Sequence, residues 1–149
     1  MLMFNELFSK PDHTFRCQFL GTTKVTNSPP QVEAFLKDMA RTAGLKAGGQ
    51  MPYCELCISR TCVWTKQKIS RVREYIRHIS RISFTTQDPD DKTVFGYVCR
   101  PVNPFENNNE LYAFKSEEAE VIIKTLRKYI GPTTNIMREA TRSLDGMYY

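Results

Sequence analysis

The chain has 149 residues, a formal net charge of +5 and 41% hydrophobic residues. This length fits one domain that buries roughly two thirds of its unfolded surface. No apolar run reaches the roughly 18 residues of a transmembrane helix, which excludes an integral membrane span. The N-terminal segment lacks the features of a secretion signal, so we expect a cytoplasmic protein. Its five cysteines, an odd number, agree with reduced thiols.

Alternating apolar residues predict a first strand over residues 15–21, FRCQFLG. A helix is expected after Pro29 and Pro30, and Gly44 is placed to end it. The apolar residues of this helix recur at helical spacing: Val32, Phe35, Leu36, Met39 and Ala43. One or two strands are predicted within residues 54–67, CELCISRTCVWTKQ, and another short strand within residues 73–79.

Residues 79–101 predict two strands around an acidic turn. The first strand places Ile82, Phe84 and Thr86 on one face and Arg81, Ser83 and Thr85 on the other. Residues 88–91, DPDD, then end the pairing, because Pro lacks an amide donor and Asp bonds its own backbone in turns. A second strand is expected over residues 94–100.

The C-terminal part of the chain predicts a loop over residues 102–110, a strand at LYAFK and a helix over residues 117–130. Ser116 is a suitable N-cap, and Gly131 with Pro132 is expected to end the helix. The remaining residues are expected to form a partly ordered tail. One apolar stripe marks the buried side of the helix: Ala119, Ile122, Ile123, Leu126, Tyr129 and Ile130.

Three segments, FRCQFLG, ISFTTQDPDDKTVFGYV and SEEAEVIIKTLRKYI, follow one another in this order. Together they resemble a phosphotyrosine-binding (PTB) domain, and they look most similar to the branch that contains Disabled, Numb and ankyrin-repeat adaptors. The resemblance implies an α+β, PH-like antiparallel β-sandwich of about seven strands, capped by a C-terminal amphipathic helix. It divides the chain into an N-terminal extension (1–14), the domain (15–131) and a tail (132–149), and it implies an adaptor without enzymatic activity.

The resemblance also implies how a ligand is bound. The strand over residues 81–87 would be a sheet edge to which a peptide adds as a further strand, beside the final helix. In the family the peptide is typically an Asn-Pro-x-Tyr segment of a receptor tail or signalling protein. The same apolar residues would also suit a core. The candidate peptide-binding residues are Arg81, Ile82, Ser83, Phe84, Thr85, Thr86, Leu126 and Ile130.

Phosphate recognition is where the sequence departs from the family. In the Shc-like branch, an Arg before the last strand binds the phosphotyrosine, but Glu110 stands at about that position here. Arg100 resembles a second basic position of that branch and is the candidate for a phosphate pocket. Because a carboxylate repels phosphate, we expect binding that does not depend on phosphorylation.

The positive charge leaves a second function open. The resemblance implies that basic residues near the first strand and first helix bind membrane phosphoinositides, so the alternative is a PH-like module for a phosphoinositide headgroup, recruited to the inner face of the plasma membrane. The candidate residues are Lys24, Lys37, Arg41 and Lys46. An ordinary solvated basic surface explains the same residues.

Other functions are disfavoured. The run VFGYV only partly resembles an RNA-recognition motif, because Thr93 and Val94 lead it and Arg100 stands where an aromatic residue would close it, so no nucleic acid is expected. Cys54 and Cys57 are spaced as in a zinc knuckle but enclose no Gly or Pro turn. We expect no metal site, no cofactor and no catalytic residues.

Overall fold

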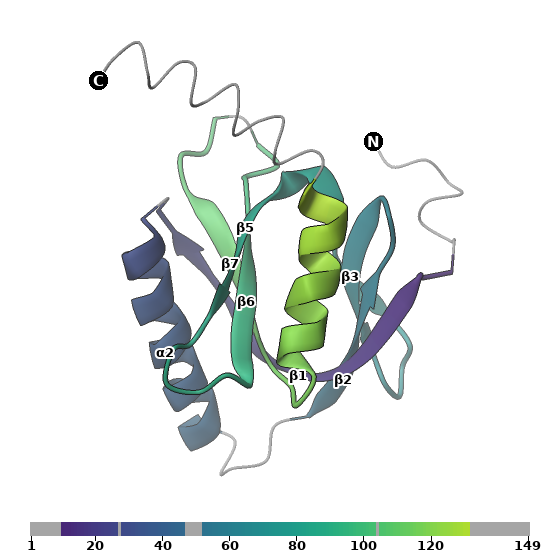
Figure 1. Cartoon of the computed structure of the whole chain (residues 1–149), viewed down its shortest axis with the longest axis horizontal. Coiled ribbons are helices and arrows are strands. Elements are labelled where there is room, and N and C mark those ends of the chain that lie inside the picture. The colour runs from purple at the N-terminus through teal and green to yellow at the C-terminus, as the bar shows by residue number, and fades with distance from the viewer. Residues whose placement is uncertain (1–9, 27, 47–51, 104, 132–149) are drawn as a thin grey trace.

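Seven antiparallel strands of the computed structural model form one sheet in the order β4-β3-β2-β1-β7-β6-β5 (Figure 1). The structure describes residues 10–26, 28–46, 52–103 and 105–131. The strands are β1 (His13–Val25), β2 (Tyr53–Ile58), β3 (Cys62–Gln67), β4 (Arg73–His78), β5 (Ile82–Gln87), β6 (Val94–Cys99) and β7 (Asn109–Lys115). Helix α2 (Pro29–Lys46) and the 3-10 helix η1 (Ile79–Arg81) precede a C-terminal helix over residues 119–131.

Strand β1 joins the two halves of the sheet. Its first part pairs with β2 and its second part with β7, and the register shifts between Phe19 and Gly21. Gly21 has a φ of 129°, a conformation that favours glycine. The sheet therefore bends along β1. The strand is longer at both ends than the predicted 15–21, because residues 13 and 14 pair with β2, and pairing with β7 extends the other end through polar residues that show no clear alternation.

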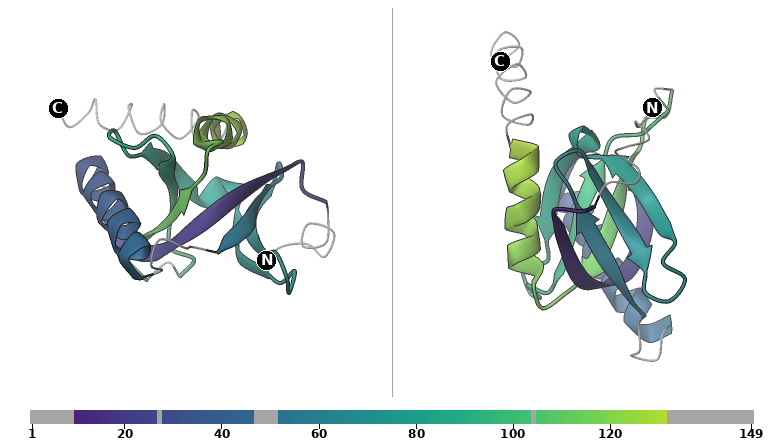
Figure 2. Two further views of the ribbon diagram at one scale, coloured as in Figure 1. Left: turned by 90° about the horizontal axis from the view of Figure 1, so that it is seen from below. Right: turned by 90° about the vertical axis from the view of Figure 1, so that its right-hand side faces the viewer.

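The main core lies inside this bend, beneath the C-terminal helix (Figure 2). Both halves of the sheet contribute to it, and so does every residue of the predicted helical stripe; Tyr129 is only partly buried. Ser116 begins the helix, since its hydroxyl accepts the Glu118 amide at 3.1 Å and donates to the Arg16 carbonyl at 2.9 Å. The predicted cap and stripe are confirmed, although regular helical turns begin two residues late, at residue 119.

Helix α2 covers the other side of the sheet. Val32 and Leu36 are fully buried and pack with residues of β6 and β7. The helix runs past Gly44 to Lys46, so the predicted end at Gly44 was wrong. A glycine inside a helix costs only about 1 kcal/mol, which packing elsewhere along the helix offsets.

Three further predictions were incomplete. Residues 54–67 form two strands, and residues 79–81 form η1 rather than the start of β5. Strand β7 begins at Asn109, which is buried, so the loop before it is shorter than expected. The predicted tail lies outside the described residues. No helix in the described ranges is long and apolar enough to cross a membrane.

Candidate functional site

Strand β5 is an edge of the sheet, as predicted. It pairs with β6 on one side and is the last strand in the order that the described residues form. An edge strand leaves backbone donors and acceptors without a neighbouring strand, and an extended peptide can pair with them. Arg81, which the sequence placed on this strand, belongs to η1 instead.

A bulge at Ser83 changes which side chains share a face. Ile82 pairs with Cys99 and Phe84 with Val98, so Ser83 is an extra residue in β5. Ile82 therefore points into the main core, whereas Phe84 packs beside α2 on the opposite side. The prediction that Ile82 and Phe84 lie on one face was wrong, because the alternation of a regular strand does not survive an inserted residue.

The backbone of β5 has a defined outward side. The Asp88 amide donates to the Val94 carbonyl at 2.9 Å. Hydrogen-bonded pairs recur at every second residue of an antiparallel ladder, so this bond determines which residues of β5 bond to β6. Thr86 and Phe84 then direct their backbone groups to β6. Thr85 and Gln87 direct theirs to the open edge, and their side chains share the face of β6 residues that belong to the main core.

The C-terminal helix meets β5 through a residue that the sequence did not indicate. The Nε of Arg127 donates a hydrogen bond to the hydroxyl of Thr85 at 3.1 Å. Nearer the start of the helix, Glu120 lies 3.8 Å from Lys92 in the β5–β6 turn. Arg127 follows the buried Leu126 and so lies at the border of the apolar stripe, which is the only sequence signal for its position.

The two helix residues that were predicted to bind the peptide are buried rather than exposed at the surface. Leu126 is fully buried and Ile130 is only 6% exposed, and both belong to the main core. Of the strand residues, Thr86 is also buried, whereas Ser83, Phe84 and Thr85 are half-buried. On this part of the described surface, the β5 edge and Arg127 are therefore what a ligand can reach.

The arginines at the start of β5 bond backbone carbonyls. A guanidinium nitrogen of Arg100 donates to the Ser80 carbonyl, and Nη1 of Arg81 donates to the Pro101 carbonyl at 3.0 Å. Both side chains therefore link η1 to the residues that directly follow β6.

Glu110 lies on β7 and is also engaged. It accepts the Tyr112 hydroxyl at 2.5 Å and lies 3.9 Å from Nη2 of Arg77. Burial and this carboxylate raise the pKa of Tyr112. The phenol therefore stays protonated and continues to donate to Glu110.

Of the three predicted basic residues whose side chains the structure describes, two pair with carboxylates. Lys37 contacts Asp90 and lies 3.5 Å from Asp88, and the hydrogen bond to Asp90 raises the pKa of Lys37. Arg41 pairs with Asp38 at 2.8 Å. Lys24 is exposed on β1, and the side chain of Lys46 lies outside the description.

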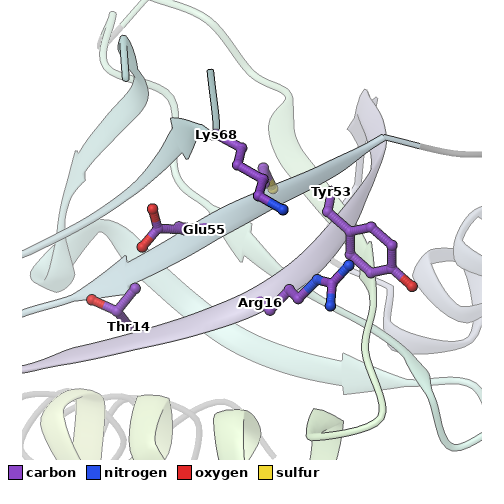
Figure 3. Close-up of a pocket in the computed structure, with 6 residues that line it drawn as sticks. Thr14, Arg16, Tyr53, Glu55 and Lys68 are labelled. Carbon is purple, nitrogen blue, oxygen red and sulfur yellow. The ribbon is translucent and has the colours of Figure 1, made fainter. Parts of the chain in front are cut away.

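A pocket of about 340 Å³ lies on the outer face of β1 and β2 (Figure 3). The Arg16 guanidinium lies 3.8 Å from the centre of the Tyr53 ring, a cation–π contact. Lys68 also lines the pocket, but so does the carboxylate of Glu55. The pocket therefore carries both signs of charge, and its carboxylate Glu55 lies 3.8 Å from Nη1 of Arg71.

The cysteines behave as buried hydrophobic residues. Cys17 and Cys54 face each other across β1 and β2, and Cys57 packs with Trp64 on the opposite face. Burial raises the pKa of Cys17 to about 12 and that of Cys54 to about 11, so these thiols stay protonated. Within the described ranges, no three His, Cys, Asp or Glu side chains are grouped to hold a metal ion.

The chain is similar to known proteins along most of its length. It is 31% identical over 129 residues to the PTB domain-containing engulfment adapter protein 1 of Danio rerio, and 30% identical to the Homo sapiens protein of the same name. Each alignment covers 81% of this chain and 41% of the relative, so the chain spans about two fifths of these curated relatives. No protein-family model matches the chain.

Two solved structures share the fold. The C-terminal phosphotyrosine interaction domain of mouse APBB2 matches with a TM-score of 0.67 at 15% identity, over 80% of this chain and 85% of that one. A chain from the crystal structure of human RhoA in complex with a DH/PH fragment of PDZRHOGEF matches with a TM-score of 0.50 at 8% identity. That match covers 83% of this chain and 29% of the other.

Proposed function

The chain is a PTB domain, a protein-interaction domain rather than an enzyme, and we propose that it recognises an Asn-Pro-x-Tyr-like segment by adding that segment as a strand to β5. The ligand segment would belong to a receptor tail or a signalling partner. In this proposal the domain is the binding part of a cytoplasmic adaptor.

The open edge of β5 carries the proposal. Thr85 and Gln87 direct backbone groups away from β6, and the C-terminal helix stands beside this edge through its contact with Thr85. A peptide strand there would gain main-chain hydrogen bonds from β5 and side-chain contacts from the helix.

An NMR amide-shift titration with an Asn-Pro-x-Tyr peptide tests the proposal. We expect the largest shifts at residues 82–87 and in the second half of the C-terminal helix, with an affinity of roughly micromolar. The amide of Leu45, at the far end of α2, serves as an internal control. Shifts confined to β4, or no shifts at millimolar peptide, would contradict strand addition at β5.

Phosphorylation of the peptide tyrosine is expected to change the affinity by less than about threefold. Arg100 and Arg81 already bond backbone carbonyls, and Glu110 adds a negative charge on β7. A phosphate would have to displace those bonds to gain an Arg fork. Calorimetry with a matched pair of peptides measures this ratio, and a preference above about tenfold for the phosphopeptide would overturn phosphorylation-independent binding.

Phosphoinositide binding is the alternative function, and we expect it to be weak. The carboxylates of Asp88 and Asp90 neutralise Lys37, the most central candidate on α2. Sedimentation with vesicles that carry a phosphoinositide measures the affinity, and Lys24→Glu is the diagnostic variant because Lys24 is exposed. Tight sedimentation that Lys24→Glu abolishes, without any peptide binding, would favour a membrane-surface module at the inner face of the plasma membrane.

A further inference from the structure

The side chain of Arg127 crosses from the C-terminal helix to the proposed ligand edge. Its Nε donates to the Thr85 hydroxyl at 3.1 Å, and Thr85 is a residue whose backbone groups face outward. This bond occupies one of the five donors of the guanidinium. The guanidinium is thus held at the open edge of β5, and most of its N–H donors are not used by the bond to Thr85.

The described part of the chain offers Arg127 no counterion. Among the described residues, no carboxylate lies within ion-pair distance of it. Strand β5 reads ISFTTQ and carries no charged side chain. Glu120, which pairs with Lys92, lies two helical turns away, about 10 Å along the helix axis. A ligand strand on β5 would therefore approach the positive charge of Arg127, beside which the described residues place no carboxylate.

We propose that Arg127 selects an acidic residue in the peptide strand. This residue would lie beside Thr85, with its side chain directed toward the C-terminal helix. This inference rests on the proposed function. An added strand would lie about 4.8 Å from β5 and alternate its side chains between the two faces. The residue beside Thr85 on the helix face is then within reach of the guanidinium, which can bind a carboxylate through two parallel hydrogen bonds.

A peptide scan tests this selection. In each peptide of the set, one residue upstream of the Asn-Pro-x-Tyr motif is Glu or Lys, and the others are Ala. In the unaltered domain, we expect one position at which the Glu peptide binds about five- to tenfold more tightly than the Lys peptide, as measured by fluorescence anisotropy. In Arg127→Glu, the preference at that position should reverse.

The matched control is Lys128→Glu, which makes the same charge change at the next residue of the same helix, where the side chain is exposed and does not face that of Arg127. It should keep the preference of the unaltered domain. If no position reverses in Arg127→Glu while the all-Ala peptide still binds, the acidic selection is wrong and strand addition stands. If Lys128→Glu reverses the preference equally, net charge rather than Arg127 is responsible, and the selection by Arg127 is overturned. If no peptide binds the unaltered domain, the proposed function itself fails.

Discussion

Replacing Thr85 by Pro is expected to weaken peptide binding by more than about tenfold while the domain stays folded. The Thr85 amide faces the open edge, so the ladder with β6 does not use it. Proline removes this donor and places its ring where the ligand strand would approach. Loss of one main-chain hydrogen bond together with the steric block accounts for the size of the effect. Calorimetric titration measures the peptide affinity, and a circular dichroism melt checks that the variant is folded.

Two control variants separate the backbone effect from other causes. Thr85→Ala removes the hydroxyl that Arg127 contacts but keeps the amide, and we expect it to retain binding within a few-fold. Thr86→Pro removes an amide that β6 uses, so we expect it to destabilise the fold. If Thr85→Pro bound the peptide as tightly as the unaltered domain, the ligand would not add to β5.

Several elements of the fold could be predicted from the sequence because they carry their own local period. The stripe of the C-terminal helix and the capping by Ser116 follow from spacing within one segment, and the structure confirms both. The assignment of residues 81–87 to an edge came from the family resemblance. Neither composition nor alternation distinguishes an edge strand from a central one here.

The missed features depend on contacts between distant segments. The bulge at Ser83 reflects how β5 fits β6, and an inserted residue leaves no mark on the alternation of ISFTTQ itself. Lys37 meets the acidic turn 53 residues later in the chain, a pairing that no local pattern indicates. Arg127 was missed for the same reason, because its partner Thr85 belongs to another element.

Gly96 shows how tightly strands β6 and β7 are packed. A Cβ atom at this position would lie 2.5 Å from the carbonyl oxygen of Tyr112 and 3.0 Å from Cδ1 of Leu111. The nearer atom belongs to the backbone of the neighbouring strand, so no side-chain rotation can relieve the clash. Only glycine fits between these strands without moving them apart.

The substitution Gly96→Ala is therefore expected to lower the free energy of unfolding by about 3 kcal/mol, a large part of the stability of a single domain. Denaturant titration followed by Trp64 fluorescence measures this change. Gly44→Ala is the matched control, because a Cβ atom there meets nothing within 4 Å and alanine favours the helix by up to about 1 kcal/mol. Equal stability in the two variants would mean that β6 and β7 can separate without cost. Such a separation would also shift β5 relative to the C-terminal helix, so the ligand edge depends on this contact.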